Sequence, residues 1–526
     1  MPPRAPQGQP DSPDSDPDAE RESARSTGTG ISAPQTTTHG VMYQSLARGL
    51  AAVSGYALHV VAARWLGAES YGNLVLVLSI MLWGKNLQSH FLVPGMVKVV
   101  SEDPRRLSAA LGVARRWYAP AALVSFVVVL AVALGFGGMA DSWGIAVLLA
   151  VGAAEIPLAA THRLSCRLLL ATRRYIQGSV VLSTYTVLRA VLGCSLILLG
   201  AGALGGVSGQ VLGSGAAALV GVFLLFQALV RYPHRDYSPM LSRALSWTGF
   251  MLPAMVAMTT LLSIDLWMVK GLTESGETTG LYGAAYTLAR APRLFAVAMA
   301  GSVFPRVSGE LADGSDHLAR SVARDAVRTV IIIFVPVCVL VGGSAAEVIT
   351  FLFSQTYTAA GMPLVFLITA GSLGALLTVL LALVAAANHP GVRLGVVLGL
   401  VPLSALANWV LIPRYGLVGA AGGTAMVMAT GALVSYLYTR RYLELKVPAA
   451  TCLRCGAAGL AVGLAAGYWP ATGWMVIPKL GAFGALYLVL LLGTGEIGLR
   501  EIRMVVNALP GPIRHRISSM TGLGDA

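Results

Sequence analysis

Apolar residues gather in fourteen long runs along the chain, and short polar segments separate the runs. A helix needs about 20 mostly apolar residues to cross a bilayer. Each run therefore predicts a membrane-spanning helix, and the expected fold is an all-α polytopic membrane protein. The fourteen predicted spans are residues 42–63, 73–95, 117–136, 142–162, 178–200, 204–230, 245–269, 281–303, 327–343, 362–387, 392–412, 417–438, 449–469 and 474–496.

A weak internal repeat divides these spans into two pseudo-symmetric six-helix lobes. Tyr71-Gly72 opens the second span, and Tyr282-Gly283 opens the eighth, 211 residues later. A shift of 208 residues would instead align Lys85 with Arg293. The Tyr-Gly pairs favour 211, without pairing individual residues. The predicted domains are an N-lobe at 41–230, a C-lobe at 245–438 and two appended helices at 449–496.

Basic residues outside the spans predict the orientation of the chain. Alternate loops carry 21 Lys and Arg residues, and the other loops carry 3. Cytoplasmic loops hold the excess of cations in membrane proteins, so both termini are predicted to be cytoplasmic. Residues 1–40 have no apolar run and predict a disordered tail. We expect no cleaved signal peptide. The basic tail 497–526 is either an amphipathic segment on the inner leaflet or a solvated tail.

Composition excludes several function classes. Charged residues make up 12% of the chain, against about 25% in soluble domains. The net charge of +13 is explained by the cationic loops, so we expect no nucleic-acid partner. Cys452 and Cys455 form a lone C-x-x-C, which is too few ligands for a zinc site. The chain has no phosphate-binding loop and no hydrolase motif. We expect neither an enzyme nor a resident cofactor.

Four cations lie within the predicted spans, where an ionisable group is costly unless it faces a cavity or a partner. They are Arg48, Lys85, Arg290 and Arg293. If the lobes meet at their first hairpins, all four line one central cavity that binds an anion. Arginine matches phosphate oxygens in a bidentate manner. Snorkelling to the headgroups remains open for Arg48; Lys85 and Arg290 are too deep for it.

Three further ionisable residues occupy the spans. Asp265 is predicted either to balance Arg290 and Arg293 or to bind a coupling cation, Na⁺ or H⁺. Glu155 and Arg189 lie at similar depth on adjacent helices. They are therefore expected to form a buried ion pair, although a role in ligand binding or ion coupling stays open.

Four motifs carry a family resemblance. Asn408 to Gly422 resembles the N-x-x-L-I-P-x-Y-G-x-x-G-A-A hairpin of bacterial polysaccharide flippases. Three shorter segments are similar to other parts of that family, namely residues 66–72, 348–357 and 280–285. Together with the span count, they resemble the polysaccharide branch of the multidrug/oligosaccharidyl-lipid/polysaccharide flippase superfamily over residues 41–496.

That resemblance implies two lobes in a V shape with a cavity open alternately to each side. It implies a polyprenyl-pyrophosphate-linked oligosaccharide as substrate, whose pyrophosphate is held by the cavity cations. It also implies the cytoplasmic (inner) membrane, membrane lipids as surroundings, and a glycan polymerase and glycosyltransferases as partners. The identity of the glycan and the energy source stay open.

Two other functions remain as alternatives. A cation-coupled multidrug exporter of the same superfamily would favour twelve spans and an acidic cavity. A non-transporting scaffold for glycan assembly would leave the interior charges unexplained.

Overall fold

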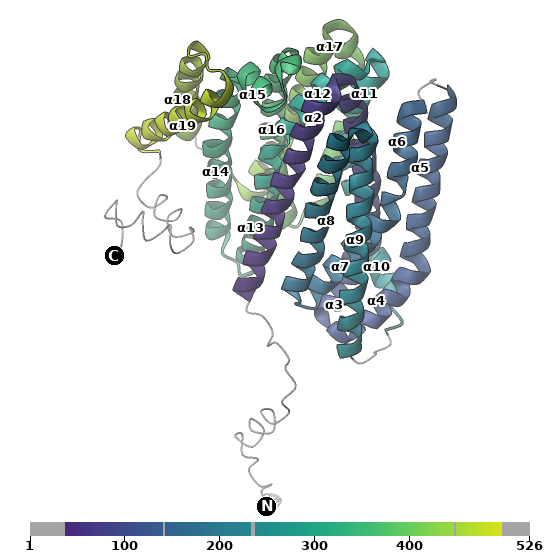
Figure 1. The fold of residues 1–526 in the computed structure, drawn as a ribbon. Helices are drawn as coiled ribbons and strands as arrows, with labels where there is room; N and C mark the ends of the chain where they lie inside the picture. Colours follow the sequence, from purple (N-terminus) through teal and green to yellow (C-terminus); the bar gives the residue numbers. More distant parts are fainter. Residues whose placement is uncertain (1–36, 140–142, 233–236, 446–448, 497–526) are drawn as a thin grey trace, which may run out of the picture.

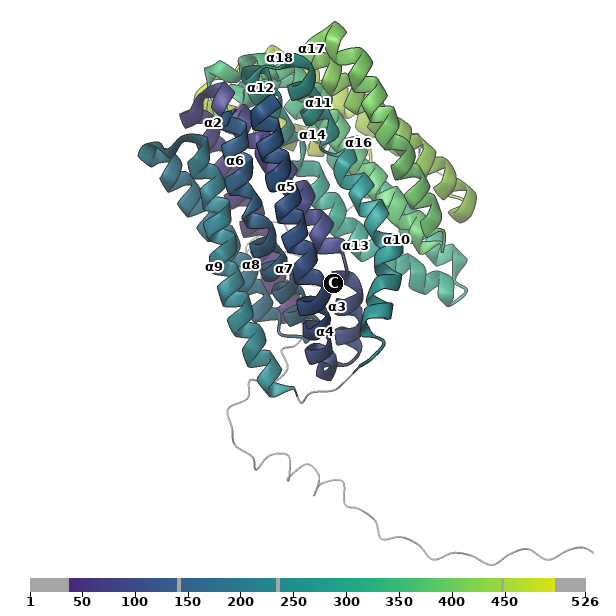
Figure 2. The same cartoon turned by 90° about the vertical axis from the view of Figure 1, so that its right-hand side faces the viewer.

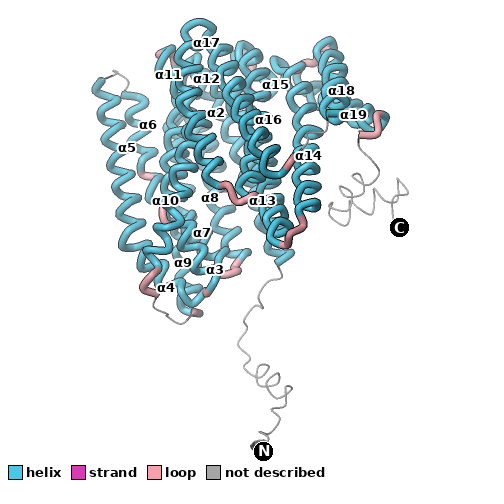
Figure 3. Tube along the Cα trace, turned by 180° about the vertical axis from the view of Figure 1, so that it is seen from behind, coloured by secondary structure: helices cyan, strands magenta, loops and turns pink. Residues whose placement is uncertain are grey.

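A computed structural model describes residues 37–139, 143–232, 237–445 and 449–496 as helices joined by short loops (Figure 3). No strand occurs within these ranges. Most of the predicted N-terminal tail and the whole tail 497–526 lie outside the described residues. Residues 37–40 were expected in that tail, but they form the first turn of a helix that begins at Thr37.

The N-lobe begins with α2 (Thr37–His90), which holds the first two spans. Its two halves meet at Gly67, whose φ of 75° and ψ of 168° turn the chain back. The other N-lobe elements are α3 (Val93–Glu102), η1 (Pro104–Arg106), α4 (Leu107–Val113), η2 (Ala114–Tyr118), α5 (Ala119–Met139), α6 (Trp143–Ala153), α7 (Glu155–Ala171), α8 (Tyr175–Leu196), η3 (Ile197–Ala201) and α9 (Gly202–Arg231).

The C-lobe contains two broken spans and one long hairpin. The hairpin is α17 (Pro390–Leu443), which turns at Gly416. The broken spans are α10 (Met240–Leu261) with α11 (Ile264–Thr273), and α12 (Gly276–Ala289) with α13 (Ala291–Ala312). The remaining elements are α14 (Asp316–Gly343), α15 (Ala345–Leu352), η4 (Gln355–Ala360) and α16 (Gly361–Ala386), followed by the appended α18 (Ala449–Tyr468), η5 (Gly473–Met475) and α19 (Val476–Gly493).

These helices confirm the predicted membrane fold. Nine helical stretches in the described ranges are long and apolar enough to cross a bilayer. Three of them have 49, 57 and 54 residues, about twice the length of one span, and each reverses at glycines with positive φ. With the two broken spans of the C-lobe, the helices account for every predicted span. The N-lobe and C-lobe stand side by side in Figure 2.

The lobes meet tightly at the end of the molecule that is uppermost in Figure 1, here called the upper end. Gly72 of α2 lies against the backbone of Gly276 and Gly280 in α12. A Cβ atom added at Gly280 would overlap the Ala68 carbonyl oxygen. Two side chains add hydrogen bonds between the lobes here. The Tyr357 hydroxyl donates to the Ala63 carbonyl at 3.0 Å. Arg64 donates to the carbonyls of Leu352 and Phe351.

The contacts at the upper end correct the register of the internal repeat. Gly72 lies against Gly280, Ala68 against Gly280, Gly72 against Gly276, and Val75 against Gly283. A shift of 208 residues maps this set of contacts onto itself, whereas the predicted shift of 211 does not. The Tyr-Gly pairs are similar in sequence, but the backbone packing shows which residues of the two repeats are equivalent. With a shift of 208 residues, Lys85 is the repeat equivalent of Arg293.

A second line of contacts joins α2 and α3 to α10 and α11 from the upper end towards the lower end, where α2 begins (Figure 1). Three hydrogen bonds and one ion pair cross between the lobes here, and two of the hydrogen bonds are donated by tryptophans. The pairs are Ser79 with Trp267, Trp83 with Thr260, Leu92 with Thr248, and, as the ion pair, Glu102 with Arg243. The lobes are therefore closed along this edge through most of their depth.

Candidate functional site

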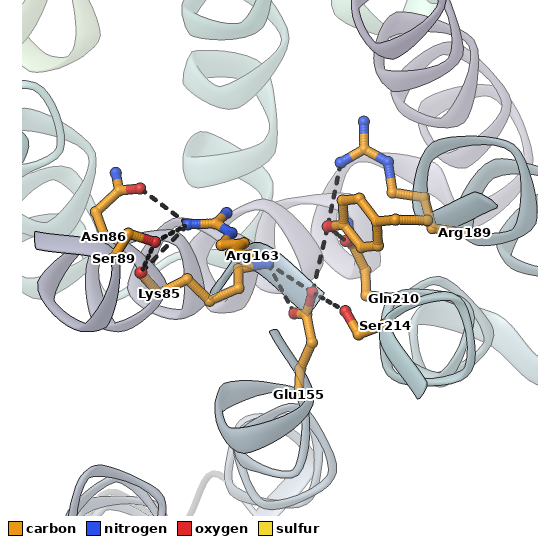
Figure 4. A network of polar contacts seen from close by, with 9 residues as sticks. Lys85, Asn86, Ser89, Glu155, Arg163, Arg189, Gln210 and Ser214 are labelled. Atoms are coloured by element: carbon orange, nitrogen blue, oxygen red, sulfur yellow. Dashed lines mark hydrogen bonds and ion pairs between the residues drawn. The ribbon is translucent and has the colours of Figure 1, made fainter. Parts of the chain in front are cut away.

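Lys85 and Glu155 form a buried ion pair in the N-lobe (Figure 4). Lys85 Nζ lies 2.8 Å from both carboxylate oxygens of Glu155. The two side chains are only 5% and 1% exposed. Lys85 comes from the second half of α2, and Glu155 is the first residue of α7. The charge of Lys85 is thus balanced, and this residue is not a free cation.

Glu155 does not pair directly with Arg189, contrary to the expectation from their equal depth. Three donors surround the carboxylate: Lys85, the Ser214 hydroxyl at 3.0 Å and the Tyr185 hydroxyl at 3.3 Å. Arg189 reaches the same network only through Tyr185, whose hydroxyl lies 3.5 Å from Nη1 (Figure 4). The Tyr185 hydroxyl also lies 2.8 Å from Gln210 Oε1.

Arg189 points instead at the first half of α2. Its Nη2 donates to the Ala51 carbonyl at 3.4 Å, and a Cβ atom at Gly55 would lie 2.9 Å from the same nitrogen. The missing side chain of Gly55 therefore leaves room for the guanidinium group. In the part of the chain that the structure describes, Arg189 has no carboxylate partner.

Arg290 and Arg293 line a pocket inside the C-lobe, together with Asp265 and Tyr286. Arg290 sits at the break between α12 and α13 and lies over the Tyr286 ring, 5.0 Å from its centroid. Such cation–π contacts stabilise a guanidinium without cancelling its charge. Both arginines thus face a pocket, and neither pairs with a carboxylate within the described ranges.

Asp265 lines the same pocket from the first turn of α11. Its carboxylate accepts hydrogen bonds from the Tyr282 hydroxyl at 2.8 Å, the Thr424 hydroxyl at 3.2 Å and the Leu266 amide at 2.8 Å. Among the described residues it forms no ion pair with Arg290, although both line the pocket. Asp265 is therefore held by neutral donors.

One face of α2 connects the cations of the two lobes. Arg48, Gly55 and His59 share this face, since positions 7 and 11 residues apart fall within about 20° of each other on a helix. His59 Nδ1 lies 3.3 Å from the Tyr71 hydroxyl, which lies 3.4 Å from the Thr287 hydroxyl of α12, about one turn before Arg290. Arg189 contacts the same helix at the Ala51 carbonyl. Arg189 of the N-lobe and the end of α12 that carries Arg290 therefore both lie close to α2.

Arg48 lies on the same face but nearer the lower end, where its side chain is exposed. Of the four predicted cavity cations, Arg290 and Arg293 share one pocket, Lys85 is paired within the N-lobe, and Arg48 is separate. Arg189 was expected to pair with Glu155. It is instead the N-lobe cation that lies beside α2 without a carboxylate partner among the described residues.

The sequence analysis missed two arginines of α7. Arg163 and Arg167 were assigned to a loop because the fourth apolar run ends at residue 162, but α7 continues to Ala171. Arg163 Nη1 donates to Ser89 Oγ at 2.9 Å and to the Lys85 carbonyl at 3.2 Å (Figure 4). Their spacing of four residues, one helical turn, was the available signal.

Comparisons with solved structures show which fold this is. The lipid II flippase MurJ in an inward closed conformation is similar over 86% of this chain and 98% of that chain, with a TM-score of 0.68 and 13% identity. A multidrug resistance MATE family transporter of the MOP superfamily, in an inward-facing conformation, covers 77% of this chain and 98% of its own, with a TM-score of 0.63 and 14% identity. A MOP superfamily transporter from Pyrococcus furiosus has a TM-score of 0.52 and 15% identity over 77% of this chain and 93% of its own.

Sequence comparison gives a shorter match. The probable low-salt glycan biosynthesis flippase Agl15 of Haloferax volcanii is 24% identical over 183 residues, 34% of this chain. The match spans 39% of that protein's length. No protein-family model matches the chain. The chain therefore has the fold of MurJ and the MATE transporters, which are flippases and transporters and not enzymes.

Proposed function

We propose that this chain is a flippase that moves a polyprenyl-pyrophosphate-linked oligosaccharide across the cytoplasmic membrane by alternating access. We take the lower end to be cytoplasmic, because the excess of basic loop residues favours that orientation. Movement then runs from the lower to the upper leaflet, for assembly of a cell-surface polysaccharide. Glycosyltransferases would supply this substrate, and a glycan polymerase would consume it.

The observation that carries the proposal is a pair of cations from opposite lobes beside α2. Arg189 donates to α2 at Ala51, Arg290 ends the helix α12 that contacts α2 through Thr287, and no carboxylate of the described residues pairs with either arginine. Unpaired cations inside a membrane protein favour an anionic ligand. A pyrophosphate offers oxygen atoms to both lobes at once, which suits the planar guanidinium group. Arg293 extends this site on the C-lobe side.

The name of the Haloferax volcanii protein supports the lipid-linked glycan as cargo, since a glycan biosynthesis flippase matches part of this chain. The fold shared with the lipid II flippase MurJ supports a flippase as the kind of protein. For the coupling ion we propose Na⁺ or H⁺ at Asp265, whose carboxylate is buried beside the hydroxyl groups of Tyr282 and Thr424. Hard cations prefer such oxygen ligands.

The test is flipping of a polyprenyl-pyrophosphate-linked oligosaccharide in proteoliposomes. We expect flipping by the wild-type chain, loss of at least tenfold with Arg290→Gln, and partial activity with Arg290→Lys. Arg414→Gln is the matched control, because Arg414 is an exposed arginine near the Gly416 turn. Wild-type rates in Arg290→Gln would refute the anion site, and no flipping of any such lipid by the wild type would refute the function.

A multidrug exporter is the second candidate, because the MATE transporters share the fold. Buried Asp265 suits a cationic drug better than an anion. The surplus of cations on both sides of α2 opposes it. Resistance of a sensitive host to cationic drugs, conferred by the wild-type chain and lost with Asp265→Asn, would support this alternative.

A further inference from the structure

The N-lobe and the C-lobe each hold a buried carboxylate directly after a break in a membrane-spanning helix. Glu155 is the first residue of α7, which follows α6 after Ala154, and Asp265 lies in the first turn of α11, which follows α10. The two residues are 1% and 2% exposed. The repeat shift of 208 residues takes Glu155 to Pro363, so the two carboxylates are not repeat equivalents. Their surroundings are therefore two separate arrangements that can be compared.

The two carboxylates have the same kinds of oxygen neighbours. The hydroxyls of Tyr185 on α8 and Ser214 on α9 both donate to one oxygen of Glu155, Oε1. In the C-lobe, a tyrosine hydroxyl and a threonine hydroxyl likewise both donate to one oxygen of Asp265, Oδ2. Carboxylate and hydroxyl oxygens are ligands that hard cations prefer. The oxygen atoms around Glu155 therefore suit a cation as well as those around Asp265 do.

The two arrangements differ in one group, the ammonium of Lys85. Its Nζ lies 2.8 Å from both carboxylate oxygens of Glu155. Within the described ranges, the carboxylate of Asp265 accepts hydrogen bonds from neutral donors and has no such partner. An ammonium bound by both oxygens of a carboxylate has the charge of a free monovalent cation and takes the position where that cation would bind.

The backbone that carries Lys85 is held against the helix that carries Glu155. Arg163 of α7 donates from Nη1 to the Lys85 carbonyl at 3.2 Å, to Asn86 Oδ1 at 3.3 Å and to Ser89 Oγ at 2.9 Å (Figure 4). Separation of the ammonium from the carboxylate would leave two uncompensated charges in a buried environment. The ammonium is thus tethered and cannot leave its position as a free ion does.

We infer that Glu155, Tyr185 and Ser214 form a monovalent-cation site in the N-lobe, and that the ammonium of Lys85 is its permanent occupant. A chain without this ammonium has a free site that takes Na⁺. With the ammonium in place, the N-lobe keeps a fixed cation through the transport cycle, and exchangeable ions bind in the C-lobe alone. This last statement rests on the proposed function, which places the coupling ion at Asp265; the cation site of the N-lobe does not depend on it.

Thermal unfolding of the full chain in detergent tests the site, with Asp265→Asn as the background so that the C-lobe carboxylate does not respond to Na⁺. NaCl replaces N-methylglucamine chloride at constant ionic strength. A ligand that binds only the folded chain raises its unfolding temperature, so we expect a rise of roughly 2–4 °C for Lys85→Ala in this background. The background alone and the further variant with Glu155→Gln should not respond. Lys98→Ala is the matched control, because Lys98 also pairs with a glutamate but is 53% exposed.

Methylammonium chloride is the second probe, because it supplies the charged end of a lysine as a free ion. Stabilisation of Lys85→Ala by both Na⁺ and methylammonium, lost with Glu155→Gln, supports the site. Stabilisation by methylammonium alone overturns the assignment to Na⁺, and equal unfolding temperatures in all three salts overturn the site altogether. Lys85→Ser is the second variant if Lys85→Ala does not fold. Failure of both variants to fold when they are extracted in either NaCl or methylammonium chloride also counts against the site.

The flipping assay tests the confinement of exchangeable ions to the C-lobe. The flipping rate of the wild-type chain should be first order in the driving ion, Na⁺ or H⁺, because only the site at Asp265 is free to exchange it. Second-order dependence, or a rate that depends on neither ion, overturns this confinement. If the wild type flips no polyprenyl-pyrophosphate lipid, the proposed function is refuted. The unfolding measurements on the Lys85 variants still decide whether the N-lobe holds a cation site.

Discussion

Removal of the Lys85 charge tests whether this residue belongs to the fold or to the ligand site. In Lys85→Met the Glu155 carboxylate keeps only the Ser214 and Tyr185 hydroxyl donors. Breaking a buried ion pair costs about 3–5 kcal/mol. Two remaining donors place the loss of folding free energy near the lower end, at about 3 kcal/mol.

The double variant Lys85→Met/Glu155→Gln removes both charges and keeps similar volumes. Replacing a whole buried pair is often close to neutral. We therefore expect a loss of about 1 kcal/mol, so that the second substitution recovers about 2 kcal/mol. Arg320→Gln is the control, because its ion pair with Glu444 is 40% and 67% exposed and contributes at most about 1 kcal/mol.

Thermal unfolding of the purified chain in detergent, followed by tryptophan fluorescence, measures these differences. Lys85→Met should unfold several degrees below wild type, and the double variant should regain most of the loss. The reasoning is refuted if Lys85→Met unfolds like Arg320→Gln, or if the double variant is no more stable than the single. Flipping adds a second criterion: a stable double variant that no longer flips would return Lys85 to the substrate site.

Three further changes test the upper end and the proposed ion site. Gly280→Ala should hold the upper ends of the lobes apart, because the added Cβ overlaps a carbonyl of α2. Gly271→Ala is the control and should leave the lobes in place, because there is open space around Gly271. Spin-label distances between the lobes measure both outcomes. Arg64→Gln should shift the same distances towards opening by roughly 5- to 30-fold in population, because bonds from a cation to a helix C-terminus contribute about 1–2 kcal/mol. Unchanged distances would contradict it. Asp265→Asn should make flipping independent of Na⁺ and H⁺ gradients, and retained dependence would exclude this carboxylate as the ion site.

Hydropathy predicted the spans of this chain well because a bilayer imposes a length on every apolar helix. The errors lie where a helix continues beyond the apolar run. The ninth span was expected at 327–343, but α14 begins at Asp316. About three helical turns that carry charged residues therefore precede the apolar run. Arg163 was placed in a loop for the same reason. A charge ends an apolar run without ending a helix.

Pairing inside the lobes was less predictable, because sequence position indicates depth and not the direction in which a side chain points. Glu155, Lys85 and Arg189 all lie within reach of one another in depth. The rotation of α7 directs the carboxylate to Lys85, 70 residues away, and leaves Tyr185 between it and Arg189. Helix rotation is a property of packing, which one sequence does not reveal.

The close approach of Gly72 and Gly280 constrains which mutations can rescue one another. Each lobe presents to the other the surface that it receives, as two identical subunits do around a two-fold axis. In most packed pairs, a clash from an enlarged residue is relieved by a smaller partner. At Gly72 and Gly280 no smaller partner exists. Second-site suppressors of Gly72→Ala must therefore lie away from this contact, at positions that shift one lobe against the other.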